Sequence, residues 1–497
     1  MKAIYTLIVF LFFSFYSQAQ MVDSNTPSGA LPTNTYLGSD WALDFSDEFE
    51  DATVNTAKWN IDNSTNSRNP RPAIGINRWF WRTRSVSLAN GKLELNVEKT
   101  DWQTMVCGSI NTNNKYETTY GYYEARIQIA ETDHGTHTAF WLQGDNMVNG
   151  TPADDSGADG AEVDIFESAW LGDFTKAVVH IDGYGANKQA STKQYSTPGI
   201  HTGYHTYGFY WTKEYMRIYY DGVLKTTYKD PKYIPQVDEY LWLSDGASFG
   251  LGDEPDTDVF FVDRPIGDLT KAYVEYIRGW KSSKTNIAAG KTVTVSSERN
   301  GFPASNIVDG ETVANESRWL TADAANGIGW AEIDLGGTYN VTGFRALSGF
   351  DGFNRPFQDY QFQYHNGTTW VDIVSINGET DAIVEQYFIG VTTDKVRLNI
   401  TGNSEPFIRL YELEVYGESV LSVNDFNKKE MIIFPNPTTG EITFKDINQE
   451  VEANIMDVRG AVIKTQKTRY SIDLSSLPSG MYFVAIKGYK TEKVIKL

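Results

Sequence analysis

Three closely spaced carboxylate side chains could act together on one substrate. Glu162 and Asp164 alternate with apolar residues as in a β-strand, where side chains two residues apart share one face. Glu167 lies at an odd offset and would point into the core, where an ionised carboxylate is costly. A bulge of one residue near Ile165 or Phe166 would place the Glu167 side chain on the same face as the other two acids. Bulges are common beside active sites. The spacing therefore predicts a bulged strand with three acids in one row.

Crowded carboxylates of this kind have separated pKa values. One acid stays ionised, whereas another is held protonated by its like-charged neighbours. Hydrolysis of a glycosidic bond needs such a pair, one acid serving as nucleophile or base and the other as proton donor. A solvated acidic strand face or a calcium site would use the same residue types and are the alternatives. Glycoside hydrolysis is the chemistry that the pattern favours.

The strands that must position these acids belong to a block from about Asp40 to Lys281. This block is rich in Trp and Tyr, and segments such as 92–97 and 122–127 alternate polar with apolar residues. Helical periodicity is scarce. A block of about 240 residues with many short strands predicts one β-sandwich or jelly roll.

Two further β-rich regions follow this block, so the predicted fold class is all-β. Their strands are again separated by turns that contain Gly and Asn. The predicted organisation is a signal peptide at 1–19, a jelly-roll catalytic domain at 20–283, a β-sandwich at 284–417, a linker at 418–430 and a small β-sandwich at 431–497.

Composition excludes several classes of protein. The chain has 43 basic and 64 acidic residues, a net charge of −21, which opposes the phosphate neutralisation that a nucleic-acid binder needs. One cysteine, Cys107, excludes an intramolecular disulfide framework. Lys2, an apolar run at 4–16 and small residues at 17–19 are typical of a secretory signal peptide. No later segment has about 18 uninterrupted apolar residues, so we expect no membrane span. We also expect the exported protein to be a monomer.

The segment from Glu162 to Glu167 resembles the ExDxxE signature of glycoside hydrolase family 16 in its bulged form. This resemblance implies a jelly roll whose long cleft cuts polysaccharides internally with retention of configuration. It implies that Glu162 is the nucleophile, that Glu167 is the general acid/base, and that Asp164 tunes their protonation and orients the nucleophile. No catalytic cofactor is expected. The supporting landmarks, in family order, are Asp47-Glu48-Phe49, Gly121 to Arg126, Ala139 to Leu142, Trp211, Tyr219 to Gly222 and Val274 to Arg278.

The nature of the substrate is suggested by a basic stretch at 63–93. It lacks Asp and Glu but contains Arg68, Arg71, Arg78, Arg82, Arg84 and Lys92. In so acidic a chain this local excess of positive charge suits an anionic polymer, because the planar guanidinium group of arginine binds sulfate or carboxylate. We select Arg78 and Arg82 as anion-binding candidates, with Trp79 and Trp81 to stack on sugar rings. An ordinary mixed surface loop is the alternative.

The segment from Phe140 to Gly144, Phe-Trp-Leu-Gln-Gly, resembles the red-algal galactan branches of the family (agarases, porphyranases and carrageenases) more than its laminarinase branch. This resemblance implies an endo-β-galactanase acting on a sulfated galactan, with porphyran or agar ahead of carrageenan. A laminarinase-type endo-β-1,3-glucanase or a κ-carrageenase is the alternative enzyme. A non-catalytic glycan-binding protein is a further alternative, but the presence of all three acids favours catalysis.

Other aromatic and histidine side chains are candidates for the cleft. Trp141 and Trp170 flank the acids in sequence and would either stack on sugars or pack in the core. His180 lies on the next predicted strand, where it would bond a sugar hydroxyl or satisfy a buried loop. The remaining candidates are Tyr184, Trp211 and Trp242, followed by His134 and His137 in a predicted loop.

The second β-rich region resembles a discoidin (coagulation factor 5/8 C-type) module, close to a family 32 carbohydrate-binding module. The landmarks are Ala304 to Gly310, Ser317 to Trp319, Trp330 to Gly336 and Leu410 to Gly417. The resemblance implies that Asp309 and Glu412 help to bind a structural Ca²⁺, with oxygen ligands of the kind that Ca²⁺ prefers. Ordinary turn and strand residues are the alternative. The glycan ligand is not implied, because a fold does not fix a function.

The last β-rich region resembles the C-terminal sorting domain of the type IX (Por) secretion system. The landmarks are Phe434 to Gly440, Met456 to Gly460, Leu477 to Phe483 and the closing Lys493 to Leu497. The resemblance implies that the type IX machinery carries the protein across the outer membrane, to the cell surface or the medium. The expected partners are therefore this machinery and a polysaccharide substrate.

Overall fold

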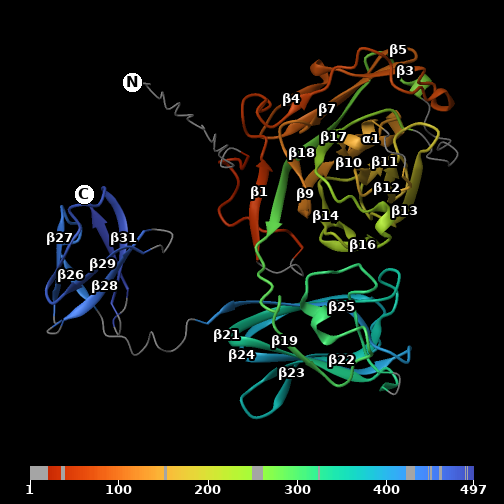
Figure 1. Cartoon of the computed structure of the whole chain (residues 1–497). Helices are drawn as coiled ribbons and strands as arrows, with labels where there is room; N and C mark the ends of the chain where they lie inside the picture. The colour runs from red at the N-terminus through yellow and green to blue at the C-terminus, as the bar shows by residue number, and fades with distance from the viewer. Residues whose placement is uncertain are drawn as a thin grey trace, which may run out of the picture. The chain divides into compact units, whose positions relative to one another are not determined.

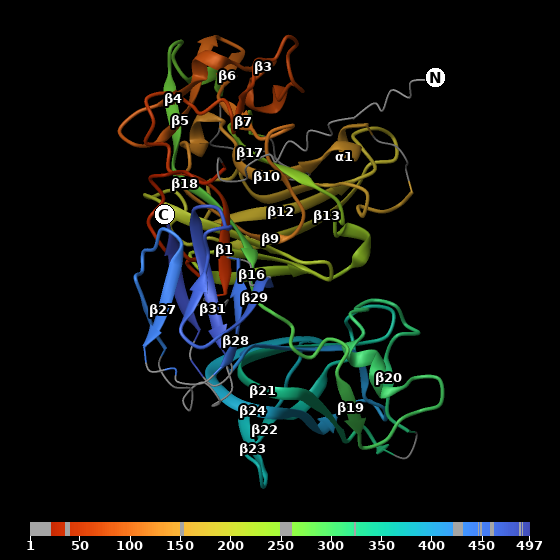
Figure 2. The same ribbon diagram turned by 60° about the vertical axis from the view of Figure 1, so that its left-hand side comes forward.

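The computed structural model describes most of the chain and shows three β-domains (Figure 1). It describes residues 21–34, 40–149, 154–248, 261–322, 325–420, 431–445, 447, 450–457, 462–486, 489 and 491–497. The predicted signal peptide and most of the predicted linker lie outside these residues. The described chain confirms the all-β fold class, and Figure 2 shows the same groups of strands from a second direction. None of the helices in the described ranges is long and apolar enough to span a membrane.

The first domain contains two sheets, of which the larger has ten strands. These are β1 (Trp41–Asp47), β3 (Arg78–Trp81), β4 (Val86–Leu88), β5 (Leu93–Asp101), β6 (Thr104–Cys107), β9 (Gly121–Gln128), β14 (His205–Trp211), β15 (Met216–Tyr220), β16 (Val223–Tyr228) and β18 (Leu269–Ser282). Their order is β16-β15-β14-β9-β18-β5-β6-β3, with β1 beside β18 and β4 beside β5. Strand β3 pairs with β6 in parallel.

The smaller sheet of the first domain has eight strands and carries the three acids. Its strands are β2 (Asn60–Ile61), β7 (Ser109–Asn111), β8 (Glu117–Thr118), β10 (Thr138–Gly144), β11 (Glu162–Ser168), β12 (Phe174–Ile181), β13 (Gln189–Ser196) and β17 (Glu239–Ser244). They follow the order β13-β12-β11-β10-β17-β7-β2, with β8 beside β17. Helix α1 (Asp145–Asn149) follows β10, and short 3₁₀ turns occur at Pro72–Ile74, Thr83–Ser85, Thr132–His134, Pro231–Tyr233, Phe261–Asp263 and, in the second domain, Ala304–Val308.

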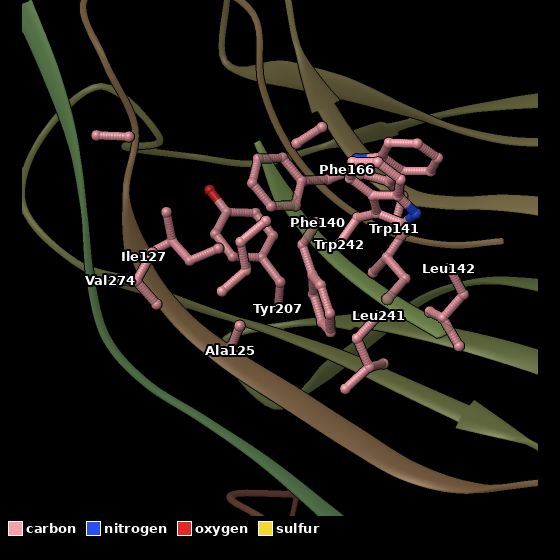
Figure 3. Packing of buried hydrophobic residues seen from close by; sticks show 14 of the residues in the cluster. Ala125, Ile127, Phe140, Trp141, Leu142, Phe166, Tyr207, Leu241, Trp242 and Val274 are labelled. Carbon is pink, nitrogen blue, oxygen red and sulfur yellow. The ribbon is translucent and has the colours of Figure 1, made fainter. Parts of the chain in front are cut away.

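The core of the first domain lies between these two sheets. Phe166 of β11 stacks on Tyr207 of β14, with ring centroids 3.8 Å apart. Phe140 and Leu142 of β10 are also fully buried in this core, which Figure 3 shows at close range. Because side chains alternate along a strand, the residues between them face the opposite side of the small sheet. Burial of one face therefore decides which residues the other face can offer to a substrate.

The second domain has seven strands in one hydrogen-bonded sheet. These are β19 (Thr292–Val295), β20 (Trp319–Leu320), β21 (Gly329–Ser348), β22 (Phe357–His365), β23 (Trp370–Ile376), β24 (Ile383–Asn403) and β25 (Arg409–Ser419). Their order is β20-β25-β21-β24-β22-β23, with β19 beside β21. The described chain divides into two compact units, and the first contains the first domain and most of the second, without residues 335–341 and 391–394.

The third domain forms the main part of the second unit and has two small sheets. One sheet has the order β26-β27-β30 and the other β29-β28-β31-β32. The strands are β26 (Ile432–Phe434), β27 (Glu441–Lys445), β28 (Val451–Met456), β29 (Val462–Thr468), β30 (Ser471–Asp473), β31 (Gly480–Ile486) and β32 (Glu492–Lys496).

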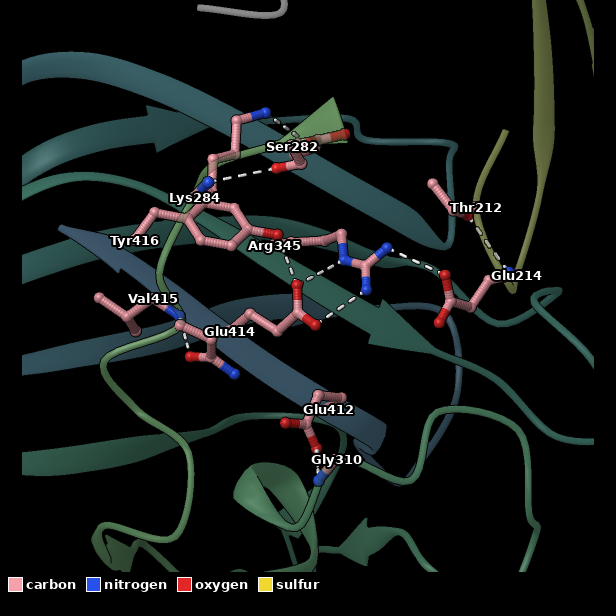
Figure 4. A network of polar contacts seen from close by, with 12 residues as sticks. Thr212, Glu214, Ser282, Lys284, Gly310, Arg345, Glu412, Glu414, Val415 and Tyr416 are labelled. Carbon is pink, nitrogen blue, oxygen red and sulfur yellow. Dashed lines mark hydrogen bonds and ion pairs between the residues drawn. The ribbon is translucent and has the colours of Figure 1, made fainter. Parts of the chain in front are cut away.

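Buried polar contacts join the first two domains within their common unit. The Arg345 guanidinium of β21 lies 2.7 Å from Glu414 in its own domain and 3.0 Å from Glu214 in the first domain (Figure 4). Tyr215 of the first domain donates a hydrogen bond of 2.9 Å to Glu385 of the second. A buried arginine needs compensating charge. Each domain therefore supplies one carboxylate to the same buried cation.

Candidate active site

The predicted bulge is present in β11 and is confirmed by the pairing on both sides of the strand. Against β10, Phe140 pairs with Phe166, but the next residue, Trp141, pairs with Asp164, so Ile165 is extra. The register between β11 and β12 also shifts between Asp164 and Glu167. Two consecutive apolar residues enter the core at this point, and the following acid returns to the open face.

The structure brings the three acids onto the wall of one cavity of about 670 Å³. Each lies opposite a cleft-facing residue of β10: Glu162 opposite Gln143, Asp164 opposite Trp141, and Glu167 opposite Ala139. The cavity is lined by Ser67, Arg68, Asn69, Arg71, Trp79, Trp81, His137, Ala139, Trp141, Gln143, Glu162, Asp164, Glu167, His180, Tyr184, Lys188, Trp242, Ser244, Asp245 and Gly246.

Burial sets the protonation of Glu162 and Asp164. It raises the pKa of Glu162 to about 7, although a hydrogen bond from Tyr184 opposes the rise. Burial, followed by the charges of Glu167 and Glu162, raises the pKa of Asp164 well above its ordinary value. Burial and the neighbouring acids therefore both favour the protonated form of Asp164.

His180 lies opposite Glu162 across the β11–β12 pair. Its Nε2 atom lies 3.6 Å from Glu162 Oε1 and 3.6 Å from Asp164 Oδ2. Burial lowers the pKa of His180 to about 4, so its imidazole is neutral at pH 7. A neutral imidazole can act here as a hydrogen-bonding group for a ligand without adding charge to the acids.

Glu167 is held by groups from a different part of the fold. His137 Nε2, just before β10, lies 3.0 Å from Glu167 Oε1. The hydroxyl of Thr175 donates a hydrogen bond of 2.7 Å to the backbone carbonyl of Glu167 and accepts one of 3.2 Å from its N–H. The backbone beyond the bulge is thus fixed by side-chain bonds where the regular ladder is interrupted. A carboxyl fixed in this way beside Glu162 can exchange a proton with a bound ligand.

Four tryptophans form an aromatic wall beside the acids. Trp141 and Trp242 stack with ring centroids 4.5 Å apart and planes 11° apart. Trp81 lies 5.3 Å from Trp242, and Trp79 lies 6.0 Å from Trp81. All four line the cavity. Flat aromatic faces of this kind suit the apolar faces of sugar rings.

Arg78 and Arg82 do not line the cavity that holds the acids. On β3 the alternation turns Trp79 and Trp81 toward the cavity, so the residues on either side of them face away. Arg78 is exposed and pairs with Asp101 at 3.0 Å. Arg82 bonds to backbone carbonyls and lies over the ring of Phe80.

The cations that do line the cavity are Arg68, Arg71 and Lys188. The guanidinium of Arg68 lies 3.7 Å from the ring centroid of Trp81 and 5.1 Å from that of Trp79. Among the described residues, no carboxylate lies within ion-pair distance of Arg68. The basic stretch in the sequence indicated a cationic wall, but it did not identify which arginines form it.

Two predicted tryptophans lie elsewhere. Trp170 is buried against Phe174, with ring centroids 5.3 Å apart, and does not line the cavity. Trp211 is fully buried and donates to the carbonyl of Pro235 at 3.0 Å. Gln143 also lines the cavity although the sequence argument did not select it. Its place in the alternation with Trp141 is the signal that could have found it.

The second domain brings Asp309 and Glu412 together at the end of a 3₁₀ turn. Glu412 is fully buried, and its Oε2 accepts a hydrogen bond of 3.3 Å from the backbone N–H of Gly310 (Figure 4). Its Oε1 has no hydrogen-bond partner among the described residues. Burial, with smaller contributions from Glu414 and Asp309, raises the pKa of Glu412 to about 9. A buried carboxyl oxygen without a partner, next to a second carboxylate, fits a divalent cation.

Three family models match the chain, in the order of the three domains. They are glycosyl hydrolases family 16 at residues 77–244, the F5/8 type C domain at 292–413, and the secretion system C-terminal sorting domain at 432–497. These matches confirm the resemblances to glycoside hydrolase family 16, to the factor 5/8 C-type module and to the sorting domain. The sorting domain indicates type IX secretion and a location outside the cell or on its surface.

Curated relatives resemble the first domain at low identity. The endo-1,3-1,4-beta-glycanase ExoK of Rhizobium meliloti (strain 1021) is 30% identical over 215 residues, 42% of this chain and 71% of the relative. Beta-porphyranase E of Zobellia galactanivorans is 26% identical over 241 residues, 44% of this chain and 83% of the relative. Kappa-carrageenase of Pseudoalteromonas carrageenovora is 27% identical over 217 residues, 37% of this chain and 51% of the relative.

The raised pKa of Glu162 predicts a pH-dependent stability. The unfolded chain releases this proton near the ordinary pKa of 4.5, whereas the folded chain holds it up to about 7. The stabilising contribution of the protonated form is therefore complete below about pH 4.5 and is lost as the pH rises through about 7. The neutral amide in Glu162→Gln does not ionise, so this variant keeps the stabilising contribution at every pH. It should unfold at a higher temperature than the wild type above pH 7, and the difference should become smaller toward pH 4.5.

Calorimetry of both proteins across this pH range measures the effect. Glu50→Gln, at an exposed position, is the control and should follow the wild type at every pH. A difference between Glu162→Gln and the wild type that does not change with pH would contradict the raised pKa.

Proposed function

The chain belongs to glycosyl hydrolase family 16 through its first domain, and from this membership we propose that it is an endo-acting, retaining glycosidase that cleaves β-linkages in a sulfated red-algal galactan such as porphyran or agar. The observation that carries the proposal is the bulge in β11, which places Glu162, Asp164 and Glu167 on the wall of one cleft. The sorting domain fits the degradation of a polymer outside the cell.

The proposed reaction uses Glu162 and Glu167 in two displacements. An oxygen of the Glu162 carboxylate attacks the anomeric carbon, and the bond from that carbon to the glycosidic oxygen breaks as Glu167 gives its proton to the leaving oxygen. Glu167, now ionised, then takes a proton from water as the water oxygen attacks the same carbon, which releases the Glu162 carboxylate. Two inversions give net retention. Asp164, which lies between them in the row and has a raised pKa, tunes their protonation and orients the nucleophile.

An internal mode of cleavage is supported by the extent of the binding surface. Trp242 lines the cavity that holds the acids and also a second depression of about 420 Å³. The second depression is polar and is lined by Asn60, Asp62, Asn111, Asn113, Asn114 and Lys115. A row of tryptophans that continues into a row of amides can hold several consecutive sugar residues, which an enzyme that cuts within a polymer requires.

The anionic character of the proposed substrate is supported by Arg68, Arg71 and Lys188 at the cavity wall. Arg68 carries a charge beside two tryptophans and has no ion-pair partner among the described residues, so a sulfate group could serve as its counterion. The similarity to a porphyranase over 83% of that relative agrees with this substrate class. A laminarinase-type β-glucanase is the second candidate, favoured by the similarity to the glycanase ExoK.

Substitution of Arg68 by Ala tests the substrate class. Because a hydrogen bond to a charged group contributes about 1.5–3 kcal/mol, kcat/KM on porphyran should fall about 10-fold to 100-fold. Cleavage of neutral agarose or laminarin should fall much less. Arg78→Ala, which removes an exposed arginine paired with Asp101, is the matched control and should change neither. Reducing ends released from porphyran, agarose, κ-carrageenan and laminarin measure all of these effects.

Each outcome of this polymer panel has a definite meaning. Cleavage of laminarin alone would contradict the galactan proposal and favour the β-glucanase. Equal losses on charged and neutral polymers in Arg68→Ala would contradict a role in anion recognition. If the wild-type chain cleaves none of the polymers, the proposed substrate class is wrong.

We further propose that Asp309 and Glu412 hold a structural Ca²⁺ in the second domain. The partnerless buried oxygen of Glu412 supports this assignment, because a bound cation would supply the charge that its burial now lacks. Added CaCl₂ should raise the unfolding temperature of this domain relative to EDTA, since a ligand that binds the folded state stabilises it. The Ca²⁺ effect should disappear in Glu412→Gln. Calorimetry of the full chain measures both, and an unchanged unfolding temperature in the wild type would contradict the site.

A further inference from the structure

A chain of hydrogen bonds runs through three side chains and ends on Glu162. The hydroxyl of Tyr240 donates to the side-chain oxygen of Gln143 at 2.7 Å. The amide nitrogen of Gln143 donates to the hydroxyl oxygen of Tyr184, and the Tyr184 hydroxyl donates to Glu162 Oε2. Gln143 and Tyr184 each accept from one neighbour and donate to the next. All of the donors therefore point in one direction, toward the carboxylate of Glu162.

The fold fixes the first part of this relay directly. Tyr240 of β17 pairs with Gln143 of β10, and Gln143 pairs in turn with Glu162 of β11. These three residues are cross-strand neighbours in the centre of the small sheet, where side chains on one face lie about 4.5–5.5 Å apart. Gln143 is buried between the other two strands. The hydrogen bond from Tyr240 of β17 therefore fixes the orientation of the Gln143 amide, whose nitrogen faces the cleft.

Tyr184 reaches the cleft from a tight turn after β12. Asp182 and Gly183 have φ values of 61° and 74°, the left-handed conformation that an Asp-Gly pair adopts most readily. The turn is anchored because Asp182 Oδ1 accepts a hydrogen bond of 3.1 Å from the backbone N–H of Asp154. This reversal sends the half-exposed ring of Tyr184 back over the acids, where its hydroxyl meets Glu162.

We propose that Tyr184, oriented by Gln143 and Tyr240, is a positioning residue that holds the Glu162 carboxylate ionised and turned for attack. The inference rests on the proposed function, because it takes Glu162 as the nucleophile. The bond from Tyr184 engages Oε2, so Oε1 is the oxygen that meets the anomeric carbon. Bonds to a charged acceptor are stronger than neutral ones, and a relay with all donors in one direction reinforces its last bond.

The charged surroundings of Glu162 show why such a donor matters. Like-charged or acidic groups come from its own strand and from β17, whereas the cations come from loops at the cavity wall. Hydrogen bonding to the charged form of an acid favours that form, and among the influences on Glu162 the Tyr184 bond is the largest that lowers its pKa. The titratable groups around Glu162 are Asp164 and Glu167 of β11, His180 of β12, Glu239 and Tyr240 of β17, Tyr184 and Lys188 of the loop after β12, and Arg68.

The direct test is the titration of Glu162 in the full chain by ¹³C NMR of carboxyl-labelled glutamate. The signal is assigned by its absence in Glu162→Gln. Tyr184→Phe removes only the hydroxyl, so the pKa of Glu162 should rise by about one unit. Gln143→Met, which breaks the relay but keeps Tyr184, should give a smaller rise. Tyr233→Phe, a phenol outside the cavity lining, is the matched control and should give none.

Kinetics on a cleaved polymer supply the second readout. In Tyr184→Phe the acidic limb of the pH profile of kcat/KM should move up by the same amount, because that limb reports the ionisation of the nucleophile in the free enzyme. A higher KM with an unmoved acidic limb would show that Tyr184 binds substrate, and would overturn the proposal.

The NMR titration needs no substrate, so it separates this inference from the proposed function. An unchanged Glu162 pKa in Tyr184→Phe overturns the inference even if the enzyme is active. A rise in the pKa supports the relay even if porphyran is not the polymer that the enzyme cleaves.

Discussion

An ionised carboxylate cannot lie in an apolar core, and this constraint determines the shape of the acid-bearing strand. In a regular strand Glu167 would share a face with Val163 and Ile165, which pack in the core between the sheets. The extra residue in β11 buries both Ile165 and Phe166 and returns Glu167 to the cleft. The core thus accepts one more apolar side chain at the point where the active site gains its second glutamate. The other groups of the site can act on a substrate only because this kink aligns them.

The same burial that fixes the geometry also distributes the charge. The two glutamates lie among a neutral His180, a wall of tryptophans and Asp164, whose pKa is raised by burial and by the charges of its neighbours. The polar contacts that remain become important for that reason. The hydroxyl of Tyr184 contacts Glu162, and the ring of His137 contacts Glu167. Two chemically similar acids thus acquire different partners, which is the condition for giving them different roles.

Much of the site could be predicted from the sequence because two simple rules act on β11. Alternation in a strand and the cost of a buried charge together required a bulge between Asp164 and Glu167. The same alternation explains why Arg78 and Arg82 do not line the cavity that Trp79 and Trp81 face, because neighbours in a strand face opposite sides.

Other features depend on segments without a repeat. Arg68 reaches the cleft because its irregular segment pairs back along β3, where its N–H bonds to the carbonyl of Trp79 at 2.9 Å. The position of Tyr184 depends on a left-handed turn at Asp182 and Gly183. No periodicity predicts the course of such segments, so the sequence argument named Tyr184 as a candidate without placing it and did not select Arg68.

The central claim is that the kinked strand presents Glu162 as the nucleophile and Glu167 as its proton donor. A 2-deoxy-2-fluoro glycoside of a cleaved oligosaccharide, with a good leaving group, traps the covalent intermediate of a retaining enzyme, and peptide mass spectrometry locates the attached sugar. The sugar should be found on Glu162. A sugar attached to Asp164 or Glu167, or rapid turnover that inverts the anomeric centre without any trapped intermediate, would contradict the account.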